Sequence, residues 1–137
     1  MRFMIIVKGN QRTEAGVMPD EKLMAPMAKY HEELAKAGVL LDASGLKPTS
    51  AGVRIQFKNG KRKFIDGPFA ESKELVSGYT LIQVKTREEG MEWARRFPSP
   101  FAEEDGEIEV RQLYELDDFE PNPSVDKFRV IQEAKAK

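Results

Sequence analysis

Apolar and polar residues along the 137-residue chain follow two periods, one typical of strands and one typical of helices. Alternation is clearest over residues 53–58 and 61–65, which Asn59-Gly60 joins through a type I′ turn, so this stretch predicts a β-hairpin. Apolar residues at three- and four-residue steps predict an amphipathic helix over about 26–37. The full pattern predicts strands over residues 2–8, 53–58, 61–65, 79–85 and 108–114, and helices over about 26–37 and 87–97.

Proline and small residues set the expected boundaries between these elements. Pro26 lacks an N–H group, so the regular helix is expected to begin near it, with the turn before it as a separate piece. Residues 42–48 are small and turn-forming and are predicted to be an irregular connection. Pro121 and Pro123 divide the chain into a domain of residues 1–119 and a charged tail of residues 120–137, in which a short helix is expected.

The order strand, helix, hairpin, strand, helix, strand contains the β-α-β-β-α-β plan, with one hairpin strand added to the sheet. The predicted fold class is therefore α+β, a ferredoxin-like sandwich. Both faces of the first strand are apolar, with Phe3 and Ile5 on one side and Met4 and Ile6 on the other. Since two helices cover only one face of such a sheet, a second copy of the chain is expected to cover the other, giving a homodimer.

Packing two sheets together in this way leaves room near their edges for a small molecule. The polar strand residues expected to line this cavity and bind the ligand are Arg54, Gln83 and Arg111, with Gln56 beside them. Phe69 is a candidate for its wall.

Composition excludes several classes of protein. The chain has 22 Lys and Arg against 23 Asp and Glu, so its net charge of -1 disfavours nucleic-acid binding. With no cysteine and a single histidine, it lacks the ligands of a disulfide framework, a zinc ribbon or an iron–sulfur cluster, and neither a metal nor a cofactor is expected. No apolar run approaches the roughly 20 residues of a membrane span, so no membrane contact and a cytoplasmic location are expected.

The run Asp66-Gly67-Pro68-Phe69-Ala70-Glu71-Ser72-Lys73-Glu74, followed by Gly78-Tyr79, resembles the signature of the DGPF group of YCII-related proteins. The blocks 33–40, 92–94 and 106–111 agree with it, and the resemblance covers about residues 1–119. It implies a dimeric α+β barrel built on the ferredoxin-like plan. Many members of the group are encoded beside alternative sigma factors, and some distant relatives are enzymes that act on small aromatic-derived lactones with a His-Asp pair.

Asp66 is the first candidate for a catalytic residue. It directly follows a predicted strand and precedes a Gly-Pro turn, which fixes its backbone as a general base or ligand-orienting group requires. The alternative is that its carboxylate caps its own turn.

His31 is the second catalytic candidate, as a base beside the apolar stripe of the predicted helix. The resemblance implies the relatives' histidine one helical turn earlier, where this chain has Met27, and a helix-surface histidine is the alternative. Lys58, Lys61, Arg62 and Lys63 surround the hairpin turn, and they are interpreted as charges that prevent edge-to-edge aggregation rather than as a phosphate-binding patch.

Two functions follow from the sequence. The first is a dimeric small-molecule-binding protein, with acid–base enzymatic chemistry at Asp66 as its extension. The alternative is a non-catalytic regulatory module associated with sigma factors, in which the tail binds a protein partner.

Overall fold

The computed structural model describes residues 1–71, 74–102 and 104–136. In chain order the elements are β1 (Arg2–Lys8), α1 (Gln11–Glu14), α2 (Glu21–Lys36), β2 (Leu40–Gly45), the 3-10 turn η1 (Thr49–Ala51), β3 (Val53–Lys58), β4 (Lys61–Asp66), β5 (Val76–Gln83), α3 (Arg87–Arg95), β6 (Ile108–Gln112), the 3-10 turn η3 (Leu116–Asp118) and α4 (Pro123–Ala136).

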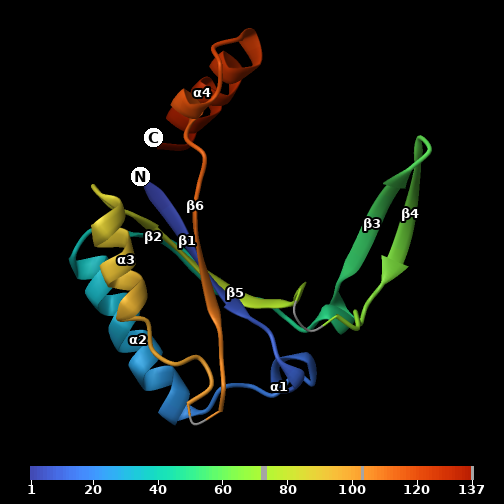
Figure 1. Cartoon of the computed structure of the whole chain (residues 1–137), viewed down its shortest axis with the longest axis vertical. Helices are drawn as coiled ribbons and strands as arrows, with labels where there is room; N and C mark the ends of the chain where they lie inside the picture. Colours follow the sequence, from blue (N-terminus) through green and yellow to red (C-terminus); the bar gives the residue numbers. More distant parts are fainter. Residues whose placement is uncertain (72–73, 103, 137) are drawn as a thin grey trace.

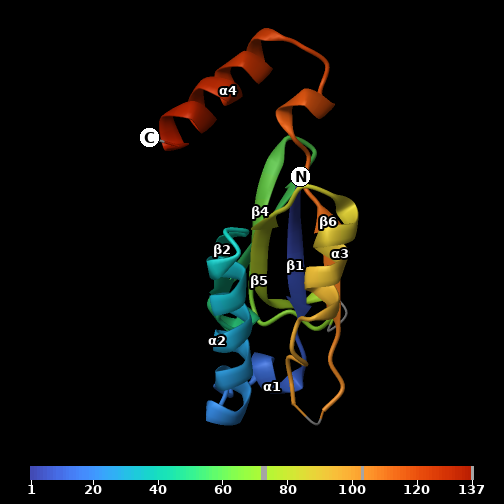
Figure 2. The same ribbon diagram turned by 90° about the vertical axis from the view of Figure 1, so that its left-hand side faces the viewer.

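Four strands form the main sheet, in the order β2-β5-β1-β6, and every neighbouring pair is antiparallel. β1 and β2 therefore run in the same direction with β5 between them, and β5 and β6 do so with β1 between them. These are two interleaved βαβ units, whose crossover helices α2 and α3 lie on one face of the sheet (Figures 1 and 2). The arrangement confirms the predicted ferredoxin-like α+β fold.

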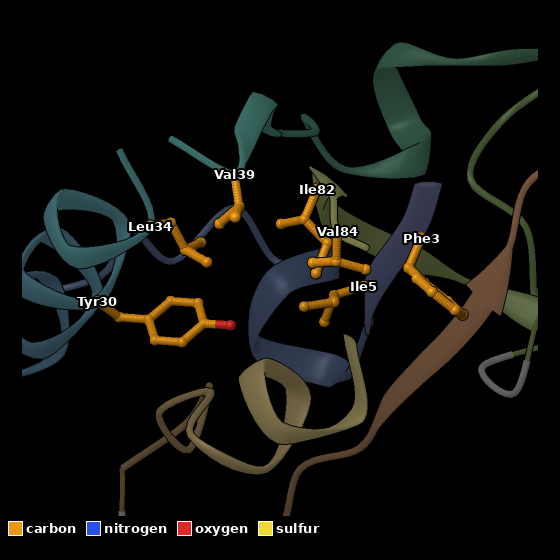
Figure 3. Packing of buried hydrophobic residues seen from close by; sticks show 7 residues of the cluster. All are labelled: Phe3, Ile5, Tyr30, Leu34, Val39, Ile82 and Val84. Atoms are coloured by element: carbon orange, nitrogen blue, oxygen red, sulfur yellow. The ribbon is translucent and has the colours of Figure 1, made fainter. Parts of the chain in front are cut away.

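The core fills the layer between this sheet face and the two helices (Figure 3). Phe3, Ile5, Leu34 and Ile82 are fully buried there. Tyr30 of α2 joins the two helices, because its hydroxyl donates a hydrogen bond of 2.7 Å to the carbonyl oxygen of Trp93 in α3. Buried apolar surface and a satisfied polar group thus fix both helices on the sheet.

The prediction of an irregular connection over residues 42–48 is wrong, because β2 occupies Leu40–Gly45 at the edge of the sheet. Ala43 lies opposite Thr80, and Gly45 lies opposite Gly78. The backbones approach closely here, since a Cβ on Gly78 would lie 3.1 Å from the carbonyl oxygen of Ser44. Backbone pairing with β5 makes this segment a strand, and its small polar side chains carry no alternating pattern that would reveal it.

The first crossover helix, α2, also differs from expectation, because it begins at Glu21 and continues through Pro26. The Asp20 carboxylate accepts a hydrogen bond of 3.1 Å from the N–H of Leu23 and caps the first turn. Pro26 removes one intrahelical donor, whose acceptor would be the carbonyl of Lys22, an exposed residue that water can reach. The cap therefore stabilises a turn that the proline alone would weaken. The preceding polar loop contains the short helix α1, capped by Asn10.

The predicted hairpin is confirmed, with Asn59 and Gly60 both at positive φ in its turn. The expectation that one of its strands extends the main sheet is wrong, because β3 and β4 form a two-stranded sheet of their own. The edge position beside β5 is occupied by β2, so the hairpin stands apart from the rest of the chain (Figure 1).

The tail contains the expected helix, α4, in which Val125 is buried. The Val125 N–H donates a hydrogen bond of 3.0 Å to Oδ1 of Asn122, which caps the first turn of the helix. No helix in the described ranges is both long enough and apolar enough to span a membrane.

Candidate functional site

The face of the main sheet opposite the helices carries an ordered set of side chains. Strand alternation places Phe3 and Ile5 under the helices and turns Met4 and Ile6 to the opposite face. The strand register extends this face into two rows that cross all four strands from β2 to β6: Asp42, Leu81, Met4 and Arg111 in one row, and Ser44, Tyr79, Ile6 and Glu109 in the next. We call these eight residues the open face, because α2 and α3 lie on the other side of the sheet (Figure 2).

The open face is apolar along its centre and polar along both edges. The central strands β5 and β1 supply Leu81, Met4 and Ile6, together with the ring of Tyr79. The edge strands supply hydroxyl, carboxylate and guanidinium groups. Sheets that are solvated on one face usually present polar residues there, so this apolar centre is typical of a face that receives a partner or a ligand.

Asp42 and Tyr79 form a hydrogen-bonded pair at the β2 edge. The Tyr79 hydroxyl donates to Oδ2 of Asp42 at 2.8 Å. This hydrogen bond raises the pKa of Tyr79, so the phenol stays protonated at neutral pH. The edge thus presents a hydroxyl donor and a carboxylate acceptor that are already oriented toward each other.

The β6 edge is positively charged at Arg111. Its side chain is 72% exposed, and its Nε lies 3.7 Å from the carboxylate of Glu109, which also lies 3.6 Å from Nζ of Lys8. Such long, exposed ion pairs are weak, so the Arg111 guanidinium can exchange its partner for the carboxylate of a ligand.

Two of the residues predicted to bind a ligand, Gln83 and Arg111, lie on this side of the sheet. Gln83 is paired with Arg2 at the end of β5, one alternation beyond Leu81. Gln83 also lines a shallow surface hollow of about 470 Å³ between the C-terminal end of α2 and β5. The other four predicted site residues lie elsewhere.

His31 lies on the helix side of the sheet, between α2 and β5. Its Nδ1 is 2.8 Å from the carbonyl oxygen of Met27, and its Nε2 is 2.8 Å from Oγ1 of Thr80, a residue 2% exposed. A carbonyl only accepts, so Nδ1 carries the proton and Nε2 of the neutral ring accepts from the threonine hydroxyl. Both ring nitrogens thus have partners inside the fold.

Asp66, Arg54 and Phe69 lie at the base of the hairpin. Asp66 is the exposed last residue of β4 and is paired with Val53, whereas Arg54 is paired with Ile65. Paired residues share a face, and successive residues alternate, so Asp66 and Arg54 point to opposite sides of the hairpin. The Arg54 guanidinium instead lies over the Phe69 ring, 4.0 Å from its centroid.

The loop after Asp66 is fastened by a cluster of backbone and side-chain contacts around Thr49. The N–H of Phe69 donates to Oγ1 of Thr49 at 3.0 Å, and the N–H of Thr49 donates to the Glu14 carboxylate at 3.1 Å. A Cβ on Gly67 would lie 1.7 Å from the carbonyl oxygen of Thr49, so only glycine fits there. Gly67 and Phe69 therefore shape the base of the hairpin and set its direction relative to α1.

Metal binding finds no support within residues 1–71, 74–102 and 104–136, where no three His, Asp or Glu side chains are placed to hold an ion together.

Residues 1–117 match the YCII-related domain. The chain belongs to the YCII-related family. The match takes in the whole main sheet and the hairpin, and it ends before α4. Over 94 residues the chain is also 33% identical to an uncharacterised protein of Rhizobium meliloti (strain 1021), a stretch that covers 69% of this chain and 75% of that relative.

Two features of the structure are not evident from the sequence of this YCII-related protein. Asp42 escaped notice because its segment was predicted to be irregular, although Tyr79 was already placed in a strand. Glu14 and Thr49 escaped notice because they are 35 residues apart and meet only in the folded chain. Alternation from Tyr79 through Leu81 to Gln83 was the available signal for the open face.

Proposed function

We propose that this YCII-related protein is a homodimer that binds a small organic anion at the edges of two facing open faces. The observation that carries the proposal is the open face itself, with apolar side chains on its two central strands and polar side chains on both edge strands. A partner's open face covers the apolar centre, and the polar edges line the cavities left at the margins.

The ligand is held by groups of opposite character. Arg111 binds its carboxylate, since an arginine fork matches the geometry of that group. Tyr79 and Asp42 lie at the opposite edge of the sheet from Arg111, so they meet it on one ligand only across the two copies. They accept hydrogen bonds from hydroxyl groups of the ligand, because the Tyr79 proton is already donated to Asp42, and Gln83 lies beside them. In this proposal His31 has a structural role, because both of its nitrogens are engaged by Met27 and Thr80.

Acid–base chemistry at Asp66 extends the proposal from binding to catalysis. Asp66 belongs to a hairpin that stands apart from the main sheet of the same copy (Figure 1). Its carboxylate therefore acts on a ligand only where the hairpin meets the second copy. Its position after a strand and before a tightly fastened loop suits a group that must keep a fixed orientation.

A thermal-shift screen of small organic acids tests the binding proposal. A ligand at 100 times its dissociation constant should add about 2.7 kcal/mol to the stability of the folded protein, which is a clear shift in Tm. Arg111→Gln should abolish the shift. Arg95→Gln, at an exposed helical site whose side chain is 71% exposed, is the matched control and should preserve it.

Asp66→Asn separates catalysis from binding, because it should retain the thermal shift and remove turnover of the bound acid. Analytical ultracentrifugation of the unmodified protein tests the dimer. A stable monomer at micromolar concentration, or a full ligand shift in Arg111→Gln, would contradict the proposal.

A second candidate function is a non-catalytic module, associated with sigma factors, that binds a protein through its tail. The observation in its favour is that α4 exposes Phe128, Val130 and Ile131, each by about 60%. Deletion of residues 121–137 should then remove a protein partner from a pull-down, and no organic acid should raise the Tm.

A further inference from the structure

The β3–β4 hairpin, which we call the arm (residues 53–66), carries one apolar face. The register pairs Ile55 with Phe64 and puts Val53 and Phe57 on the same side. These four side chains are 51% (Val53), 43% (Ile55), 71% (Phe57) and 68% (Phe64) exposed. A two-stranded ribbon with an uncovered apolar face is marginal alone, so the arm is built to pack against another surface.

The tip of the arm is strongly basic. Lys58, Lys61, Arg62 and Lys63 surround the turn, and the Arg62 guanidinium lies 5.1 Å from the centroid of the Phe57 ring. The surface that receives this tip must therefore combine aromatic side chains with negative charge.

The segment of residues 114–120, which we call the acidic segment, has that combination. The rings of Tyr114 and Phe119 pack at 5.3 Å, and these side chains are 76% and 48% exposed. Four acidic residues lie in the same seven positions: Glu115, Asp117, Asp118 and Glu120. The four cations at the tip of the arm are thus equal in number and opposite in sign to the four anions of the acidic segment.

The base of the arm prevents it from folding back onto its own acidic segment. Gly67 packs against the Thr49 carbonyl more closely than any Cβ would allow, and Thr49 is held by Glu14 and Phe69. In Figure 1 the arm and the C-terminal region both rise toward the top of the view with a wide gap between them, so closing that gap would require the arm to swing about its base and break this fastening.

We propose that the arm of one copy packs its apolar face and basic tip on the acidic segment of a second copy. This rests on the homodimer of the proposed function and adds to it a reciprocal contact that adjoins the open face, because the acidic segment directly follows β6, the edge strand that carries Arg111. In a two-fold dimer the contact occurs twice, so each copy both gives an arm and receives one.

Charge reversal on each side tests the contact. The arm variant is Lys61→Glu with Arg62→Glu, and the segment variant is Asp117→Lys with Glu120→Lys. Asp118 and Glu115 are left unchanged, because Asp118 accepts the N–H of Glu115 at 2.7 Å and Glu115 pairs with Arg2 at 2.9 Å. Asp117 pairs with Arg129 at 3.3 Å, but its side chain is 90% exposed, so losing that pair costs little. Matched reversals on α2, Glu32→Lys with Lys36→Glu, are the control, since this exposed pair lies on the helix side of the sheet.

Each variant alone should raise the dimer dissociation constant about tenfold or more, because reversing two of the four charges cancels the net charge of that side and sets two like-charged groups against the partner in both contacts. An equimolar mixture of the two variants should lower the constant again toward the wild-type value. In the mixed dimer one contact is unchanged, and in the other the two new carboxylates of the arm meet the two new lysines of the segment. Sedimentation equilibrium measures all three samples. Wild-type dimerisation should also weaken as salt rises from 0.05 to about 0.5 M, which needs no variant.

Variants that dimerise like the wild type, or a mixture as weak as its components, would overturn the arm contact and leave the open-face dimer standing. A wild-type protein that stays monomeric would overturn both. Should circular dichroism show a reversed variant unfolded, the neutral changes Lys61→Gln with Arg62→Gln and Asp117→Asn with Glu120→Gln replace it. Each neutral variant should weaken the dimer and flatten its salt dependence, and unchanged values would again overturn the contact.

Discussion

Gly67→Ala should loosen the base of the arm and leave the main sheet intact. The added Cβ would lie 1.7 Å from the carbonyl oxygen of Thr49 and 2.6 Å from its carbonyl carbon, both backbone atoms. Since ordinary contact begins near 3.4 Å, the loop and Thr49 must separate by about 1.7 Å. No rotamer change relieves such a clash.

The cost follows from the contacts that this separation breaks. The N–H of Gly67 donates to the carbonyl of Gly52 at 3.0 Å, and the N–H of Phe69 donates to Oγ1 of Thr49 at 3.0 Å. Two neutral hydrogen bonds contribute about 1 kcal/mol each, and the bond from Thr49 to the Glu14 carboxylate contributes about 1.5 to 3 kcal/mol. The local opening free energy should fall by about 2 to 5 kcal/mol, depending on whether the bond to Glu14 survives.

Native-state amide hydrogen exchange measures this local opening. A fall of about 2 to 5 kcal/mol corresponds to a roughly 30- to 4,000-fold faster exchange at the amides of Thr49 and Phe69. The core amides of Ile5 and Ile82 should keep their rates. Gly45→Ala is the control, because an added Cβ there has its nearest contact at 4.0 Å. Unchanged exchange at Phe69 would refute the steric reasoning, and equal acceleration at Ile5 would refute the independence of the arm from the sheet.

Two further predictions concern the core. Gly90→Ala should lower the free energy of unfolding by about 1 to 2 kcal/mol in urea titrations. The new Cβ would lie 2.8 Å from the fully buried Phe3 ring, and this clash outweighs the roughly 1 kcal/mol gain in helix propensity. A stabilised variant would show that the ring can move aside. Burial raises the pKa of Tyr30 to about 12, with the Arg96 guanidinium opposing, so the folded state keeps a proton that the unfolded state loses near pH 10, and stability should fall as the pH rises from 10 to 12. Tyr30→Phe should lose this part of the alkaline dependence in unfolding curves at fixed pH, together with about 1 kcal/mol at pH 7 from the missing bond to Trp93, and an unchanged pH profile would contradict the assignment.

The hairpin and the ferredoxin-like order were predictable because their signals are local. Asn59-Gly60 and the alternation on either side specify a hairpin within 14 residues, and the helix spacing before Gly38 needs no distant information. β2 was not predictable in this way, because Asp42, Ala43 and Ser44 become a strand only through backbone pairing with β5.

The candidate site was predictable only in part, for the same physical reason. Alternation along a strand tells which side chains share a face, and it puts Gln83 on the same face as Tyr79 and Leu81. It does not tell which face the helices cover, so the contacts of the His31 ring with Thr80 and Met27 cannot be inferred from it. The role of Gly67 depends on a carbonyl 18 positions earlier, which no local pattern reveals.

Hydrogen-bonded polar groups and uncovered apolar side chains lie in different parts of the molecule, and Asp66 belongs to the uncovered part. The helix side of the sheet is filled by the core, and its polar groups Tyr30, His31 and Thr80 are hydrogen-bonded. Uncovered apolar side chains instead gather on the arm, which carries Asp66 at its base. Because the loop after Asp66 fixes the direction of the arm, a change at Gly67 moves this carboxylate as well as the docking face. Loss of activity in Gly67→Ala would therefore not identify a catalytic group. Loss of activity in Asp66→Asn would identify one, because this change leaves the backbone contacts of the loop in place.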